Sequence, residues 1–289
     1  LVLWLAGLGL MRVAARLPRP SSTAWRMALA NLHRPGAATP NVVLSLGLGL
    51  TLLVTVAQIS ANLSAQIKDG VPADAPSYYF IDIQPDQIDG FETLVRGLPG
   101  VADVDRAPML RASITEVDGV RAEDARVAGD AQWALRGDRG LTYAAELPKQ
   151  NTITAGDWWP ADYAGPPLIS LDASLAQGMN LAIGDTLTFN VMGRPITAAI
   201  GNLREIDWSG MGMNFSVIFA PGTLESAPHA YLATVRVDEA HEAGVDRAVA
   251  RGYPNVTSVR VRDVLATVNT LLKQINQAVS AAASAALIA

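Results

Sequence analysis

The sequence contains no cysteine. A disulfide framework, a thiol nucleophile and a cysteine-ligated zinc site are therefore excluded for this chain. An excess of positive charge is missing as well, because 22 Lys and Arg stand against 27 Asp and Glu and leave a net charge of −5. Nucleic-acid binding depends on a basic field, so we expect no nucleic-acid partner.

Motifs of enzyme chemistry are also missing. The sequence has no G-x-S-x-G nucleophile turn and no G-x-x-x-x-G-K-[ST] phosphate loop. The histidines at 33, 229 and 241 form no HExxH pair, and the acidic stretch 82–90 lacks the spacing of a calcium loop. We therefore expect a non-catalytic chain that binds no metal or cofactor itself. If ATP is used, another polypeptide must bind it.

Charged residues make up only 17% of the chain and the mean hydropathy is +0.22, which indicates an apolar excess. Residues 41–60, NVVLSLGLGLTLLVTVAQIS, carry no charge over the roughly 20 residues that a helix needs to cross a lipid bilayer. We predict a transmembrane and stalk helix over 41–68. The apolar segment 1–17 has no basic region before it, which disfavours a signal peptide, and we expect the end of a preceding transmembrane helix.

Basic residues lie mainly on one side of the apolar run. Arginines occupy positions 12, 16, 19, 26 and 34 before it, whereas only Lys68 follows closely. The positive-inside rule therefore places 18–40 in the cytoplasm and the domain after residue 61 outside. Residues 22–34 have the spacing of a basic amphipathic helix, which fits either a passive interfacial anchor or a docking helix for a cytoplasmic ATPase. The candidate docking residues are Trp25, Arg26, Leu29, Asn31, Leu32, His33 and Arg34.

The far end of the chain repeats the pattern of the first span. Apolar residues recur at helical spacing after Asp263, and an uncharged Ala-rich tail follows them. We predict that 263–289 is a second stalk and the start of the next transmembrane helix.

The domain between the two stalks contains two segments with the same order of predicted elements. Strand-like 78–83, a helix capped by Asp86 and a strand from residue 101 are matched by strand-like 231–237, a helix capped by Asp238 and a strand from residue 256. The fold class is therefore α+β, with a discontinuous split βαβ, porter-like subdomain formed by 69–117 and 229–262.

Residues 118–228 read as a mainly β inserted subdomain. A hairpin turns at 192–195, residues 214–220 resemble a strand, and Asp172 is positioned to cap a short helix over 172–179. Such strands favour a small barrel or sandwich. The aromatic loop 157–167 fits a contact surface as well as a Trp pair that covers a barrel end. The candidate contacts to cargo or a partner are Trp158, Trp159, Met211 and Met213.

Four stretches of the sequence resemble the FtsX/MacB class of ABC-transporter permeases, and particularly the YbbP-type permeases. They are ALANLHRPGAATPNVVLSLGLGLTLLV at 28–54, FIDIQPDQ at 80–87, GPPLISLDASLAQGM at 165–179 and NLREIDWS at 202–209. The chain departs from the pattern at Ala30, where the family usually has a basic residue, which weakens any charge-based docking there.

The resemblance implies a periplasmic domain made of a porter-like subdomain and a β-rich insert, on a multi-pass protein of the bacterial inner membrane. It implies a separate cytoplasmic ATPase that uses ATP, and work done outside the membrane by movement of the stalk. The expected cargo is hydrophobic or associated with the envelope. The alternative hypothesis is a membrane-tethered scaffold or sensor that recruits an envelope enzyme.

Overall fold

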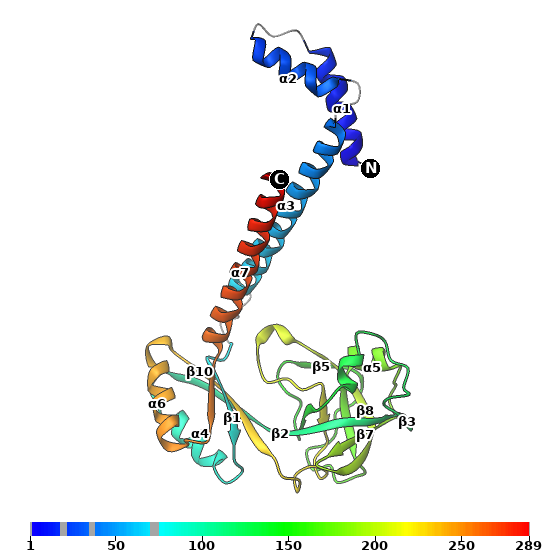
Figure 1. Ribbon diagram of the computed structural model, residues 1–289. Helices are drawn as coiled ribbons and strands as arrows, with labels where there is room; N and C mark the ends of the chain where they lie inside the picture. Colours follow the sequence, from blue (N-terminus) through cyan, green and yellow to red (C-terminus); the bar gives the residue numbers. More distant parts are fainter. Residues whose placement is uncertain (1, 18–21, 35–37, 70–74, 289) are drawn as a thin grey trace. The chain divides into compact units, whose positions relative to one another are not determined.

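The computed structural model describes residues 2–17, 22–34, 38–69 and 75–288. It divides into two compact units, Leu1–Gly70 with Leu265–Ala289, and Val71–Val264. The first unit is helical and the second carries the strands (Figure 1).

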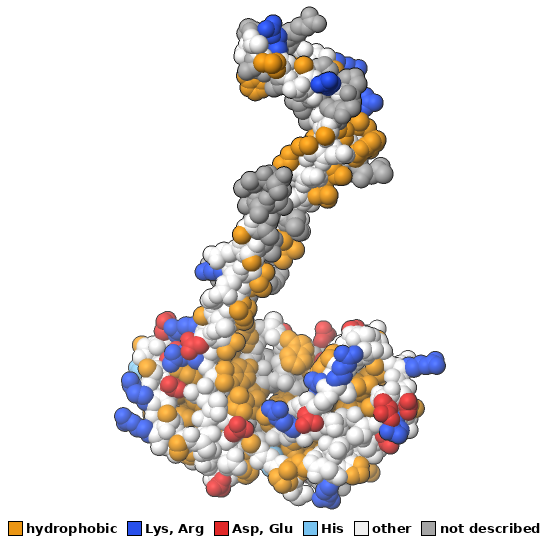
Figure 2. All heavy atoms as spheres, in the orientation of Figure 1, with side chains coloured by type: hydrophobic (Ala, Val, Ile, Leu, Met, Phe, Trp, Pro, Cys, Tyr) orange, Lys and Arg blue, Asp and Glu red, His pale blue; other side chains and the backbone are white. Residues whose placement is uncertain are grey.

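The helical unit comprises α1 (Val2–Arg16), α2 (Thr23–His33), α3 (Thr39–Asp69) and most of α7 (Val261–Ile288). Within the described ranges, one helix has the length and composition to cross a membrane: α3 over Thr39–Ile59, with a hydropathy of 2.2. Hydrophobic side chains line the face of α3 drawn in Figure 2. α1 packs closely on α3, because a Cβ atom at Gly47 would lie 2.6 Å from Leu3 Cδ2.

One half of the second unit is a four-stranded antiparallel sheet in the order β11-β1-β10-β2. Its elements are β1 (Tyr78–Ile83), α4 (Ile88–Arg96), β2 (Val101–Val117), β10 (Ala230–Val237), α6 (Glu242–Gly252) and β11 (Thr257–Arg260). β1 and β2 run parallel with β10 between them, and β10 and β11 run parallel with β1 between them. This half confirms the predicted α+β class.

The helices α4 and α6 cover one face of this sheet, beside each other (Figure 1). Phe80, Phe91 and Val235 are fully buried in the core between helices and sheet. Because side chains alternate along a strand, the residues next to these core positions, such as Tyr79, belong to the opposite face.

Two of the predicted helix caps are wrong. The N-cap of α4 is Gln87 rather than Asp86, because residues 84–87 form a turn that is closed by a hydrogen bond from Gln87 N to Gln84 O (2.9 Å). Asp238 precedes a short 3-10 helix, η3 (Glu239–His241), and makes no side-chain cap. The third prediction is confirmed, since Asp172 accepts a hydrogen bond from Leu175 N at 3.0 Å.

The other half of the second unit is a closed barrel with short helices. Its elements are β3 (Val120–Arg121), η1 (Gln132–Leu135), β4 (Arg139–Tyr143), β5 (Asn151–Gly156), β6 (Leu168–Asp172), α5 (Ala173–Met179), β7 (Thr186–Val191), β8 (Arg194–Ile206), η2 (Trp208–Gly210) and β9 (Val217–Phe219). The pairings run β2-β4-β9-β6-β8-β7 and return from β7 to β2, so the sheet closes on itself. Full closure protects the strand edges.

The predicted hairpin is confirmed as β7 and β8. Met192 and Gly193 form its two-residue loop with φ values of 50° and 88°. Positive φ at both positions is what a hairpin turn compatible with strand twist requires.

β2 belongs to both halves of the second unit. Its residue Met109 is the last to pair with β10, and Leu110 is the first to pair with β4. Val104 lies in the core under α4 and α6, whereas Leu110 lies in the barrel core. The sequence predicted the boundary between the two subdomains at residues 117 and 118. In the structure, the side chains of β2 change from one hydrophobic core to the other between Val104 and Leu110.

Candidate functional site

β11 continues into α7 without a connecting residue. The strand ends at Arg260 and the helix begins at Val261. The Val261 amide donates a hydrogen bond to the carbonyl oxygen of Ser77 at 3.0 Å. The first turn of α7 is thus bonded to the residue that precedes β1.

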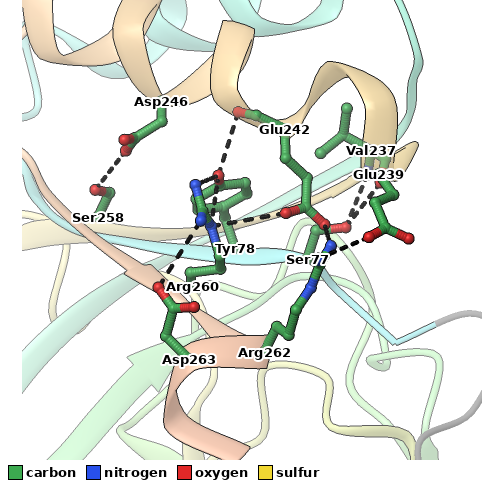
Figure 3. A network of polar contacts seen from close by, with 10 residues as sticks. All are labelled: Ser77, Tyr78, Val237, Glu239, Glu242, Asp246, Ser258, Arg260, Arg262 and Asp263. Carbon is green, nitrogen blue, oxygen red and sulfur yellow. Dashed lines mark hydrogen bonds and ion pairs between the residues drawn. The ribbon is translucent and has the colours of Figure 1, made fainter. Parts of the chain in front are cut away.

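Glu242, in the first turn of α6, forms ion pairs with arginines on both sides of this junction (Figure 3). Arg262 Nη2 lies 2.7 Å from Glu242 Oε1, and Arg260 Nε lies 3.6 Å from Glu242 Oε2. Only 12% of the Glu242 side chain is exposed, so this carboxylate is far less screened by water than a surface one. Arg262 also pairs with the exposed Glu239 at 2.8 Å.

Tyr78 holds Arg260 from the strand side. Its buried hydroxyl oxygen accepts from Arg260 Nε (2.9 Å) and Nη2 (2.7 Å), and the hydroxyl donates to the Glu242 carbonyl oxygen at 3.2 Å. Burial raises the pKa of Tyr78, so the phenol keeps its proton. The hydrogen bond to Tyr78 raises the pKa of Arg260, which stays cationic.

Ser77 adds a third point of attachment. Its hydroxyl donates to the Val237 carbonyl oxygen at 2.9 Å, and its oxygen accepts from the Val237 amide at 3.1 Å. We call Tyr78, Glu242, Arg260 and Arg262 the junction cluster, and Ser77 borders it on the side of α3. The cluster bonds the start of α7 to β1 and α6.

The junction cluster contains no nucleophile paired with a base. Within the part of the chain that the structure describes, no three His, Cys, Asp or Glu side chains gather as a metal site would require. Sequence reasoning missed this cluster, because its members lie far apart along the chain and follow no motif. The one available signal was the closely spaced pair Arg260 and Arg262 at a strand-to-helix boundary.

The predicted contact residues Trp158 and Trp159 form a packed pair, with ring centroids 4.2 Å apart. Their indole nitrogens donate to the carbonyl oxygens of Ala145 and Ala144, at 2.9 and 2.8 Å. Trp159 is only 6% exposed and packs with Phe215 and Ile218. The pair therefore has a packing role, and Trp159 offers little surface to a cargo.

Met213 lines a cleft of about 660 Å³ between the four-stranded sheet and the barrel. One wall is the helix-free face of the sheet, with Asp105 of β2 and Thr234 and Arg236 of β10. The barrel side contributes Tyr143 and Phe215 together with Met213. The structure thus brings Met213 to the cleft. Trp158, Trp159 and Met211 are not among the residues that line it, although the neighbours of Met211, Gly210 and Gly212, are.

The predicted docking residues lie on or next to α2. Trp25 is 67% exposed, Arg26, Asn31 and Arg34 are exposed, and Leu29 is half-buried. The side chains of Leu32 and His33 lie outside what the structure describes. Their role in docking stays a prediction.

No protein-family model matches the chain. Its sequence is nevertheless similar to that of an ABC transporter permease. The particular relative is YbbP of Escherichia coli (strain K12), named as an uncharacterized ABC transporter permease, with 26% identity over 241 residues. The match confirms the resemblance to YbbP-type permeases. It covers 83% of this chain but only 28% of the relative.

Among solved structures, the chain is similar to a domain of a protein from Porphyromonas gingivalis that is described as a permease. The similarity covers 65% of this chain and 90% of that one, with 14% identity and a TM-score of 0.35.

Proposed function

We propose that this chain is part of the permease subunit of an ABC transporter of the mechanotransmission type. In this proposal, a separate cytoplasmic ATPase hydrolyses ATP, and α7 carries the resulting movement to the strand-bearing unit. The sequence relationship to YbbP and the lack of a phosphate loop in this chain support the division of labour.

The observation that carries the proposal is the junction cluster. Packed elements move as bodies between discrete arrangements, so a rod transmits displacement only where it is firmly joined to the body it moves. α7 leaves β11 without a linker, and Arg260 and Arg262 hold the start of the helix to Glu242. A displacement of α7 is therefore delivered to an edge strand of the sheet.

The location follows from the same proposal. α3 crosses the bacterial inner membrane, residues 71–264 lie in the periplasm, and α2 docks the ATPase on the cytoplasmic side. The cargo is hydrophobic or associated with the envelope, and the cleft beside Met213 is the surface that we assign to it.

Reconstitution of the full-length permease with its ATPase tests the proposal. Leu271→Pro interrupts α7, because proline removes a backbone donor and clashes with the preceding turn. ATP hydrolysis should continue, while the ATP-dependent change in distance between spin labels at Asn41 and Arg247 should disappear. Leu271→Ala keeps the helix and serves as the control, and Ile275→Pro should repeat the loss.

Unchanged movement in both proline variants would overturn the mechanism. The alternative, a tethered scaffold or sensor, predicts instead that no ATPase copurifies with the full-length protein after gentle extraction.

A further inference from the structure

The two halves of the second unit share one strand, β2, and the chain passes between them a second time from β9 to β10. Pro108 of β2 pairs with Tyr231, and the strand changes partner directly afterwards, between Met109 and Leu110. Proline has no amide to donate, so the ladder is weakened where β2 passes from the sheet into the barrel. Residues 108–110 are therefore the candidate hinge between the two halves, with Met109 packed against the buried cluster of Trp159, Phe215 and Ile218.

A hydrogen bond crosses between the halves away from this point. The Tyr79 hydroxyl of β1 donates to the carbonyl oxygen of Met211, in the loop 207–214 of the barrel half. Tyr79 lies opposite Thr234 in register, and Thr234 lines the cleft. Directly opposite residues share a face of the sheet, so Tyr79 is on the cleft side.

The receiving loop is held in shape by its own contacts. Asn214 Nδ2 donates to the Asp207 carbonyl oxygen at 3.2 Å and to Gln150 Oε1 at 3.3 Å. Met211 itself adopts a left-handed conformation with φ of 52°. The Met211 carbonyl is thus presented by an organised loop whose Gly210 and Gly212 border the cleft.

Tyr79 also connects the cleft to the junction cluster. In the sheet it pairs with Val259 of β11, the residue before Arg260. A displacement that α7 delivers to β11 therefore reaches Tyr79 across one strand pair. Burial raises the pKa of Tyr79, so its hydroxyl keeps the proton that it donates.

A second contact across the cleft is weaker. Lys149 lies 3.4 Å from Asp105 and 3.8 Å from Asp103, but its side chain is 78% exposed. Exposed ion pairs contribute little, because water screens them. The Tyr79 hydrogen bond is the better candidate for holding the halves together at this position.

We propose that the hydrogen bond from Tyr79 to Met211 is the closing contact of the cleft, and that the cleft opens by rotation at residues 108–110 when α7 displaces β11 and β1. The proposal rests on the proposed function, but the opening itself is a property of residues 71–264 and needs no ATPase. Such a bond is easily broken, because a net hydrogen bond shifts an equilibrium only about fivefold.

The test removes one hydroxyl from the full chain. Since the chain has no cysteine, Arg247→Cys in α6 and Arg194→Cys in β8 supply the only thiols for a pair of spin labels, one in each half. Tyr79→Phe should add a population at longer separation. Tyr163→Phe is the matched control, because the Tyr163 hydroxyl donates to the carbonyl oxygen of Pro166 within the barrel half (2.7 Å).

Amide hydrogen exchange gives a second readout on the same variants. Exchange over residues 208–214 should be about fivefold faster in Tyr79→Phe than in the parent chain. The proposal is overturned if Tyr79→Phe matches the parent in both measurements, or if Tyr163→Phe opens the cleft as much. If the proline variants instead keep the ATP-driven movement, the proposed function is wrong. The opening of the cleft in Tyr79→Phe does not depend on that outcome.

Discussion

The two long helices join the strand-bearing unit in different ways. α7 follows β11 at the next residue, and the junction cluster holds it through Arg260 and Arg262. α3 ends at Asp69, and residues 70–77 separate it from β1. In the described part of that connection, residues 75–77, the Ser77 side chain bonds to β10. The chain is thus joined to the strand-bearing unit directly at one end and through a connecting segment at the other.

This difference indicates unequal roles for the two helices. In the proposed function, the direct strand-to-helix junction passes a displacement of α7 to the sheet. α7 therefore drives the strand-bearing unit, and α3 mainly keeps it at the membrane. Changes at the two ends of the strand-bearing unit test this inequality.

An inserted linker should have the largest effect. A Gly-Ser-Gly-Ser insertion between Arg260 and Val261 separates α7 from the sheet, so ATP-dependent movement of the strand-bearing unit should be abolished. The same insertion between Asp74 and Ala75 should leave most of the movement. Label distances with and without ATP measure both variants, and equal losses would show that the two junctions are equivalent.

Arg204→Met should lower the stability of the protein without affecting its ATP-dependent movement. Arg204 is fully buried in the barrel and donates to Asn151 Oδ1 at 2.8 Å, to Ser170 O at 2.9 Å and to Phe215 O. Burial lowers its pKa to about 10, so it is still a cation at neutral pH. Without Arg204, the buried oxygen atoms that accept its hydrogen bonds have no donor. The free energy of unfolding should therefore fall by about 3 kcal/mol, and Tm by about 9 °C.

The exposed Arg111→Met is the control for this change, with an effect within about 0.5 kcal/mol. Thermal unfolding followed by circular dichroism measures both variants. Below its lowered Tm, Arg204→Met should still move with ATP, because the junction cluster is intact. Loss of movement in the folded variant would contradict the role given to the junction.

Glu242→Gln acts on the junction itself. It removes the charge that Arg260 and Arg262 share, and should lower stability by about 2 kcal/mol, less than a fully buried pair because both arginines are partly exposed. Movement with ATP should fall more than in Arg204→Met despite the smaller loss of stability. The exposed Glu205→Gln should change neither Tm nor movement.

Ser77→Ala should have the smallest effect. It removes two hydrogen bonds to Val237 on the α3 side, which should cost about 1 kcal/mol and leave ATP-dependent movement nearly unchanged. Chemical denaturation and the same label distances measure the two quantities. A loss of movement as large as that of Glu242→Gln would show that the α3 side also transmits force.

Local patterns predicted much of this fold. The hairpin at Met192 and Gly193 and the cap at Asp172 follow from short-range turn and cap preferences, which act within a few residues. The cap at Asp86 was wrong because a turn over 84–87 shifts the start of α4 by one residue. Short-range signals find an element more reliably than its boundary.

Short-range sequence signals could not predict the candidate site. Tyr78, Glu242 and Arg260 meet only because β1, α6 and β11 are neighbours in the folded sheet, and no spacing along the chain encodes that meeting. The continuation of β2 into the barrel was missed for the same reason, since a strand looks alike whichever partner it pairs with.

The shared strand also determines the order in which this unit can fold. β2 has its barrel partners available once residues up to 219 have been made, but its partner in the four-stranded sheet, β10, ends at Val237, and the edge strand β11 ends at Arg260. Until then, the apolar residues of β1 and α4 have no closed core, since long-range strand pairing must wait for the distant segment. During synthesis the barrel can therefore form before the four-stranded sheet, whose edge strand next to α7 is completed last.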